Sequence, residues 1–293
     1  MSRKQAMSSE IKTIRVAVAQ PYTTLGDVDG NLDQVLDLSS QAALNSCRII
    51  LFPETALHGY SVPPEVLEKA ETVDGKVAQA LIAHAAKEDI VLAVGLFERD
   101  TVDPSQIFIS HFIAFPNGEL LVQRKGGGHE KPGIARNDPH EQIVFDVDGV
   151  KMSVTICIDS VKPGIEDLLV EKGCQIQFAP TAGGGAFRGI RLEDFADEEA
   201  YAAYEEAMED SCFPGGGAMR KRYLLRMALA TANLATGDDG CDYYQQGHSY
   251  MIDSDGALVG LIPGTYVQEH YRPKLTWADF HARTPQKLPP ETP

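Results

Sequence analysis

Three side chains with complementary chemistry follow apolar runs in this sequence: Glu54, Lys125 and Cys157. Glu54 comes after RIILFP, Lys125 after ELLVQR and Cys157 after KMSVTI. A carboxylate can take the proton of a thiol, and an ammonium can stabilise a thiolate and then the oxyanion of a tetrahedral intermediate. Together, the three groups could attack the carbon of an amide carbonyl or of a nitrile.

None of the three residues is informative alone. A glutamate or lysine at a strand end is usually a turn or surface charge, and a cysteine there is more often a packed thiol than a nucleophile. Because a free thiol is mostly protonated at neutral pH, a nucleophilic Cys157 needs an activating neighbour. His129 or His248 could form a Cys–His pair with it, but the local sequence places neither beside the thiol.

The elements that must position these groups alternate between strands and helices. β-Branched apolar runs bounded by Pro, Gly or Asn predict strands, and apolar residues three and four apart predict helices, with Asn31 as a helix N-cap. The predicted strands are 14–19, 48–52, 90–97, 107–115, 120–123, 143–146, 150–156, 175–178 and 230–234, with a hairpin over 250–259. The predicted helices are 31–44, 77–87, 165–172 and 220–229. This order predicts an α/β layered sandwich with a mixed sheet. In such sheets the carboxyl ends of strands hold the ligand.

The charge balance argues against two classes of partner. Lys and Arg number 26 against 42 Asp and Glu, which gives a formal net charge of −16. This is the wrong sign for binding nucleic acid or an anionic membrane, and no apolar run is long enough for a membrane span. Residues 1–13 contain no apolar secretory segment. We therefore expect a cytoplasmic protein without nucleic-acid or membrane partners.

The five cysteines are odd in number and form no C-x-x-C pair. Neither a disulfide framework nor a Cys-rich zinc site is therefore expected. No linker or internal repeat divides the chain, so we expect a single domain over 12–282. Flexible termini are expected at 1–11 and 283–293, and an acidic insertion at about 186–214.

The acidic insertion holds nine acidic residues from Arg188 to Asp210 and only two basic ones, Arg188 and Arg191. Gly-rich runs lie on both sides of it. The simpler interpretation is a solvated acidic helix, and the alternative is a mobile lid over the site. Likewise, the two arginines either pair with neighbouring acids or bind an anionic group.

The surroundings of the three candidates resemble the nitrilase (carbon–nitrogen hydrolase) superfamily. Glu54 in FPE, Lys125 in RK and Cys157 in ICID look like the Glu–Lys–Cys triad of that superfamily. The resemblance covers about residues 12–265, with the motifs in the right order. Supporting matches are VAVAQ at 16–20, GNL at 30–32, GY at 59–60, GC at 173–174, APTA at 179–182 and GHS at 247–249.

The resemblance implies a fold and an activity. The implied fold is a four-layer α-β-β-α sandwich with mixed sheets, which pairs into an αββααββα homodimer or a larger assembly. It implies no metal and no organic cofactor. Glu54 would be the general base, Cys157 the nucleophile that forms a thioester, and Lys125 the cation that polarises a small-molecule amide or nitrile substrate.

Further site residues follow from the same resemblance. The backbone N–H of Ile158 would complete the oxyanion hole, and Tyr60, Thr181 and Ala182 would line the substrate pocket. Many members carry a second glutamate between the lysine and the cysteine, which supports the lysine. Glu130, 27 residues before the thiol, is our choice for that role.

Several positions depart from the family pattern. The lysine motif usually has an aromatic residue or His two positions before the lysine and a His-Leu-type pair after it. Here Gln123 precedes it and Gly126–Gly128 follow. Lys131 is a rival for the lysine, but Lys125 lies directly at the strand end. Glu141, only 16 residues before the thiol, is too close for the supporting glutamate.

The leading hypothesis is hydrolysis of a small amide to a carboxylic acid and ammonia. Ser160 and Val161 stand where members that hydrolyse N-carbamoyl amino acids carry arginines, which disfavours that substrate. Cys-x-Asp resembles the amidase-like branches more than the nitrile-hydrolysing ones. The alternatives are a nitrilase, an N-carbamoyl amidohydrolase, an acyltransferase and a non-catalytic scaffold member.

Overall fold

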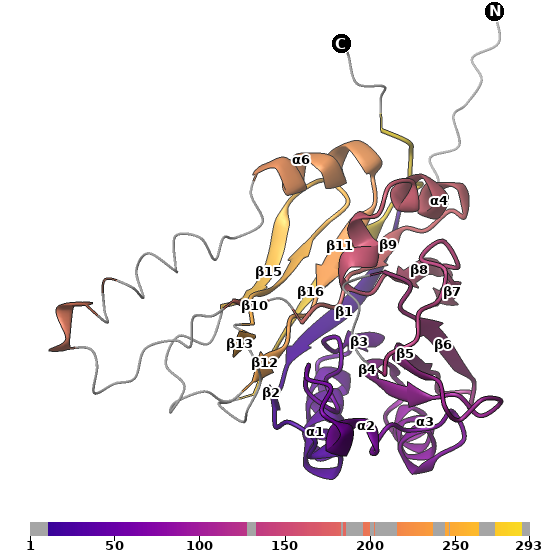
Figure 1. Cartoon of the computed structure of the whole chain (residues 1–293). Helices are drawn as coiled ribbons and strands as arrows, with labels where there is room; N and C mark the ends of the chain where they lie inside the picture. The colour runs from indigo at the N-terminus through magenta and orange to yellow at the C-terminus, as the bar shows by residue number, and fades with distance from the viewer. Residues whose placement is uncertain are drawn as a thin grey trace, which may run out of the picture.

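Two six-stranded mixed β-sheets lie at the centre of the molecule, with helices on their outer sides (Figure 1). The computed structural model describes residues 11–127, 133–182, 184–185, 196–199, 202, 216–236, 244–245, 247–263 and 273–288. In each sheet three parallel strands run through the middle, and antiparallel strands extend both sides. The α/β class with mixed sheets that the sequence predicts is confirmed.

The first sheet is built mainly from the N-terminal half of the chain. Its strands are β1 (Lys12–Gln20), β3 (Ile49–Leu51), β4 (Val91–Arg99), β5 (Ile107–Ala114), β6 (Leu120–Arg124) and β16 (Lys274–Ala282), in the order β16-β1-β3-β4-β5-β6. Strands β1, β3 and β4 are parallel, whereas β5 is antiparallel to both β4 and β6. Strand β6 therefore runs in the same direction as β3, and their carboxyl ends lie at the same edge of the sheet.

The second sheet repeats this plan. Its strands are β7 (Val144–Val147), β8 (Val150–Val154), β9 (Ile176–Phe178), β11 (Ala228–Thr231), β14 (Ser249–Ile252) and β15 (Leu258–Ile262), in the order β15-β14-β11-β9-β8-β7. Strands β8, β9 and β11 are parallel. Two short pairs lie outside the sheets: β2 (Tyr22–Thr23) with β12 (Ala235–Thr236), and β10 (Gly184–Gly185) with β13 (Tyr244–Gln245).

Helices cover the outer face of each sheet, which makes an α-β-β-α sandwich (Figure 1). The helices are α1 (Val28–Leu44), α2 (Pro64–Leu67), α3 (Lys76–Glu88), the 3-10 helix η1 (Cys157–Val161), α4 (Ile165–Glu171) and α6 (Gly216–Leu225). Apolar side chains of α1 and α3 pack on the first sheet. Helices α4 and α6 meet over the second sheet through Ile165, Leu169 and Leu225.

The main core lies between the two sheets. Because the central strands are covered on both faces, they are apolar at almost every position, which is why RIILF at 48–52 shows no alternation. Alternate residues of these strands nevertheless face different layers. The interface between the sheets is filled by Val16, Val18, Ile49 and Leu51 from the first sheet and by Met152, Val154, Ile176 and Phe178 from the second.

The start of α1 differs from the sequence prediction. The side chain of Asp27, and not that of Asn31, caps the helix by accepting the Gly30 N–H. Asn31 lies inside the helix and is buried, and its Nδ2 donates to Thr24 O at 2.7 Å and to Leu57 O at 3.0 Å. Its side chain therefore ties the helix to the loop that begins at Pro53.

Two C-terminal predictions are wrong or incomplete. The helix predicted at 220–229 ends at Leu225, and β11 begins at Ala228 within that range. The apolar run at 227–232 fits either state by pattern, because a strand buried on both faces carries no alternation. Strand β16 was not predicted, and it pairs antiparallel with β1 from Lys12 to Gln20.

Some sequence predictions lie outside the described residues. Within the acidic insertion the structure describes only residues 196–199 and 202, which are exposed. The lid and the solvated helix both stay predictions.

At the C-terminus, Gln286 donates its N–H to Leu225 O at 2.8 Å. No helix within the described ranges is both long and apolar enough to cross a membrane.

Candidate active site

Three strand ends meet at one buried point. Glu54 lies in the loop after β3, Lys125 directly follows β6, and Cys157 follows β8. The Nζ of Lys125 donates a hydrogen bond of 2.6 Å to Oε1 of Glu54, and the two side chains are 6% and 0% exposed. Both charges act on the thiol of Cys157. The structure therefore brings together the carboxylate, ammonium and thiol that the sequence singled out.

The backbone presents Cys157 on a sharp turn. Its φ angle is 53°, in the left-handed region that residues other than glycine rarely adopt. The turn is held because the Cys157 N–H donates to Pro180 O at 2.8 Å, which links β8 to the segment after β9. Backbone strain of this kind is concentrated at functional sites.

The thiol of Cys157 is strongly held in its protonated form. Burial raises its pKa to about 12 and Glu54 raises it too, whereas Lys125 and the backbone N–H of Ala182 lower it. At neutral pH the sulfur therefore carries its proton, and a nucleophilic attack needs a base at that moment. Burial lowers the pKa of His248, which favours its neutral form.

Lys125 is held as a cation. Burial works to lower its pKa, but the charges of Glu54, Cys157 and Tyr60 outweigh burial, and the net pKa is raised. Its Nζ also lies 5.7 Å from the centre of the Tyr60 ring. A positive charge is thus fixed beside the thiol.

The loop that carries Glu54 lies directly on strand β4. A Cβ on Gly95, in the middle of β4, would be 2.3 Å from Pro53 O and 2.6 Å from Thr55 N. Only glycine therefore allows this approach. This role of Gly95 was not predicted from the sequence, although a glycine inside an apolar strand is a known signal of close backbone contact.

Two buried histidines hold the same loop. His111 from β5 donates from Nε2 to Phe52 O at 3.1 Å, and His58 Nδ1 accepts the Phe97 N–H at 3.2 Å. Burial lowers the pKa of each to about 4, so both are neutral at pH 7. They therefore act as hydrogen-bonding supports for the carboxylate loop.

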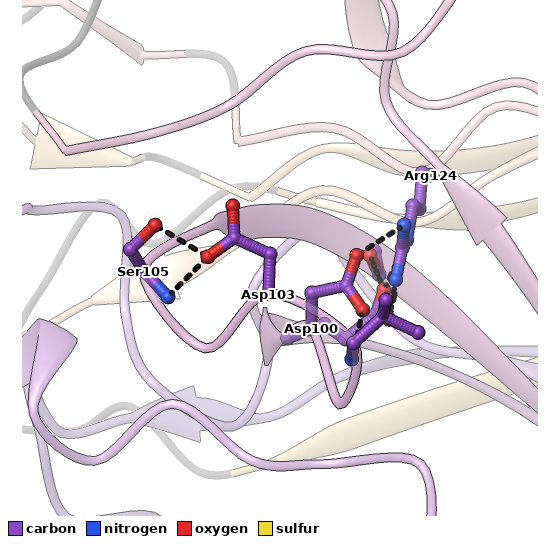
Figure 2. Close-up of polar contacts among 7 residues, drawn as sticks. Asp100, Asp103, Ser105 and Arg124 are labelled. Atoms are coloured by element: carbon purple, nitrogen blue, oxygen red, sulfur yellow. Dashed lines mark hydrogen bonds and ion pairs between the residues drawn. The ribbon is translucent and has the colours of Figure 1, made fainter.

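Lys125 is supported from both sides along the chain. The side chain of Arg124, on the other face of the strand, binds Glu98 through Nε at 3.0 and 3.2 Å. Figure 2 shows the Arg124 guanidinium beside Asp100. Nη1 of Arg124 donates to Oδ2 of Asp100 at 3.3 Å. After the lysine, the Gly126 and Gly127 N–H groups both donate to the buried carboxylate of Asp159.

The predicted pocket residues surround the three groups in different ways. Tyr60 and Lys125 line the same pocket. The Ala182 N–H lowers the pKa of the Cys157 thiol, and the Thr181 hydroxyl donates to Asn233 Oδ1 at 2.9 Å. Ile158 is 38% exposed and lies in the first turn of η1, where backbone N–H groups lack an intrahelical acceptor.

Other candidates are not placed at the site. Glu130, Lys131 and His129 lie outside the described residues, as do Arg188 and Arg191. The supporting glutamate and the rival lysine therefore stay untested. Among the described residues, no group of three or more His, Cys, Asp or Glu side chains could hold a metal ion.

Gln123 and Glu141 have a structural connection instead. The Gln123 amide is buried, donating to Glu141 O at 3.0 Å and accepting the Ile143 N–H at 2.9 Å. The Glu141 carboxylate is exposed. The glutamine that departs from the expected lysine motif therefore ties β6 to the segment before β7.

The sequence is similar to known proteins over most of its length. A family model described as carbon-nitrogen hydrolase matches residues 15–265. The chain is 24% identical over 261 residues to the glutamine-dependent NAD(+) synthetase of Thermotoga maritima, covering 85% of this chain and 40% of that protein. It is 24% identical over 236 residues to an (R)-stereoselective amidase of Pseudomonas sp, covering 80% and 75%. The chain thus spans less than half the length of that synthetase.

A solved structure shares the fold. An amidase from Nesterenkonia sp. AN1, which carries the product of Michael addition of acrylamide at its active site cysteine, superposes with a TM-score of 0.70. The identity is 21%, and the match covers 92% of this chain and 94% of that one.

Proposed function

Because the chain belongs to the carbon-nitrogen hydrolase family, we propose that it hydrolyses a small amide to a carboxylic acid and ammonia. One observation carries the proposal: the buried Lys125–Glu54 pair, 2.6 Å apart, lies beside the thiol of Cys157. Base, cation and nucleophile are the three groups that hydrolysis of an amide through a thioester needs. The amidases among the similar proteins support the same substrate class.

In the first half-reaction, Cys157 attacks the amide carbon. Its thiol proton passes to Glu54, whose Oε2 is buried without a hydrogen-bond donor among the residues described. The new C–S bond forms as the carbonyl π electrons move onto oxygen. Lys125 and the Ile158 N–H stabilise this oxyanion. When the oxyanion collapses, the C–N bond breaks and nitrogen takes the proton from Glu54, which gives ammonia and a thioester.

In the second half-reaction water is the nucleophile and the Cys157 sulfur is the leaving group. Glu54 removes a proton from water, and the hydroxyl oxygen attacks the thioester carbon. The same two donors stabilise the second oxyanion. When the C–S bond breaks, the Cys157 sulfur regains a proton from Glu54, and the carboxylic acid leaves. The enzyme returns to its starting state, and one water has been consumed for each amide.

The environment after the thiol favours an amide over an N-carbamoyl amino acid. The Ser160 hydroxyl donates to Cys157 O at 2.6 Å, so its proton is already used within the turn. Val161 is 70% exposed and offers no charge to a carboxylate. A nitrile stays the second candidate because the same three groups can attack its carbon.

We also propose that the protein works as a homodimer or larger assembly, as the family resemblance implies. Residues 12–282 would form one domain.

Ammonia release from a mixed panel tests the proposal. The panel contains primary aliphatic amides, ω-amides of dicarboxylic acids, N-carbamoyl amino acids and nitriles of matched carbon skeleton. We expect turnover of at least one amide and none of its matched nitrile. Turnover of nitriles alone would support a nitrilase. No turnover of any compound, together with a Cys157 that resists alkylation, would support a non-catalytic scaffold.

A further inference from the structure

A single carboxylate joins two of the three segments that carry the proposed site. Asp159 lies two residues after Cys157 and is fully buried. Its Oδ2 accepts the Gly126 N–H at 2.8 Å, and its Oδ1 accepts the Gly127 N–H at 2.6 Å. These glycines directly follow Lys125. The two hydrogen bonds therefore connect the end of β6 in one sheet with the turn after β8 in the other.

The close approach of the two segments requires glycine. A Cβ on Gly127 would lie 2.6 Å from Asp159 Oδ1 and 2.7 Å from Lys162 Cε. A Cβ on Gly126 would lie 2.2 Å from Pro139 N. Real Cβ atoms do not approach other atoms this closely. The glycines that replace the expected residues after the lysine thus have a structural reason, since they let the carboxylate reach the backbone.

The contact combines hydrogen bonding with charge. Burial raises the pKa of Asp159, while the N–H groups of Gly126 and Gly127 and the ammonium groups of Lys125 and Lys162 lower it. In its ionised form, the carboxylate makes stronger bonds to backbone N–H groups than a neutral acceptor would. An amide in its place could not accept both N–H groups in this geometry, because one of its two ends is a donor.

We propose that Asp159 is a positioning residue, which sets the position of Lys125 relative to the Cys157 thiol by holding Gly126 and Gly127 against the turn that carries the thiol. The inference rests on the proposed function, since it requires Lys125 and Cys157 to act on one substrate. Asp159 acts through the backbone. Its loss therefore changes the geometry of the reacting groups and not the binding of the substrate.

The first test perturbs the contact from both ends. Asp159→Asn removes one acceptor together with a charge, whereas Gly127→Ala inserts a methyl group and keeps the charge. Because a misplacement of about 1 Å can lower a rate about 100-fold, we expect kcat to fall about 10- to 100-fold in both variants. KM should stay within about twofold. The matched control is Asp167→Asn, an exposed acid in the first turn of α4 that should leave kcat unchanged.

The second test asks whether the effect passes through the lysine. The rate of alkylation of Cys157 by iodoacetamide is measured for Gly127→Ala alone and in a Glu54→Gln/Lys125→Met background. Displacing the ammonium destabilises the thiolate, so the single variant should react more slowly. In the background that has no ammonium, Gly127→Ala should have no further effect, whereas a merely structural role would give the same factor in both.

The outcomes separate this inference from the proposed function. If the wild type hydrolyses no amide, the proposed function fails, but the alkylation comparison still tests the role of Asp159. A kcat within about twofold of wild type in both variants would overturn the inference, as would equal alkylation effects in both backgrounds. Thermal unfolding is recorded for every variant. If Asp159→Asn does not fold, Gly127→Ala decides through the same two measurements.

Discussion

The ammonium of Lys125 and the carboxylate of Glu54 lie 2.6 Å apart, and neither side chain is more than 6% exposed. A buried ion pair is a poor source of stability, because the loss of hydration of two charges offsets most of their attraction. Apolar side chains of similar volume would fill the same space at least as well. The presence of both charges, buried beyond the carboxyl ends of β3 and β6, is therefore better explained by chemistry than by stability.

The pair should behave as a unit in unfolding experiments. Glu54→Gln or Lys125→Met leaves one buried charge without its partner, which should lower the free energy of unfolding by about 3–5 kcal/mol. The double variant removes both charges and should recover most of that loss, although it should have no activity. Urea unfolding of the three variants measures this. A double variant no more stable than the single ones would contradict the argument.

The pH dependence of turnover should not follow ionisation of the thiol. Burial raises the pKa of Cys157 to about 12, so the thiolate fraction grows about tenfold per pH unit between pH 7 and 9. If Glu54 removes the proton only during attack, the reactive form is the neutral thiol, and kcat/KM should be flat over this range. A tenfold rise per unit would instead identify a free thiolate as the nucleophile.

Gly95→Ala should displace the loop that carries Glu54. The added Cβ would lie 2.3 Å from Pro53 O, so the Glu54 loop must move away from β4. We expect kcat to fall about 100-fold, because the carboxylate is displaced from the thiol and the lysine. Gly118→Ala is the control, because its φ of +90° strains alanine there while nothing lies within 4 Å of the added Cβ. The turn lies at the opposite end of β6 from Lys125, so kcat should stay unchanged. Equal activities of the two variants would show that the loop tolerates the shift.

Stability should fall below pH 6.5 because of the buried histidines. Burial lowers the pKa of His58 and of His111 to about 4 in the folded protein, below the unfolded value of 6.5. The unfolded chain therefore binds protons first, and the contribution of each neutral histidine is present above pH 6.5 and is lost as the pH falls to 4. Each shift corresponds to about 3 kcal/mol.

Urea unfolding at pH 7.0, 5.5 and 4.5 checks this expectation, with His111→Gln as the comparison. The variant should be less stable at pH 7 but should lose less stability on acidification than the wild type. The same slope in both proteins would mean that His111 is not the residue that binds the proton.

The positions of the three candidate groups could be predicted because each follows a recognisable strand. Strands β3 and β6 run in the same direction, so residues placed after them meet at one edge of the sheet. The types of Glu54, Lys125 and Cys157 then indicated the chemistry. Tyr60 came instead from the family resemblance, through the Gly-Tyr motif after the glutamate, and it lines a pocket with Lys125.

The supporting contacts could not be predicted, because they join segments far apart in the chain. Asp159 was recognised as part of a motif, but its bonds to Gly126 and Gly127 depend on how the two sheets pack. His111 reads as one polar residue in an apolar strand until the fold places it against Phe52 O. Strand β16 is an edge strand with several exposed residues, and its apolar pattern alone is weak.

The most direct test of the account is the rate of ammonia release by Cys157→Ala from the best amide of the panel. Cys157 is only partly buried, and alanine fills part of the space of its side chain, so thermal unfolding should stay near that of the wild type. We predict that ammonia release by the folded variant falls below detection at saturating amide. A folded Cys157→Ala protein that keeps a substantial part of the wild-type kcat would contradict the assignment of Cys157 as the nucleophile.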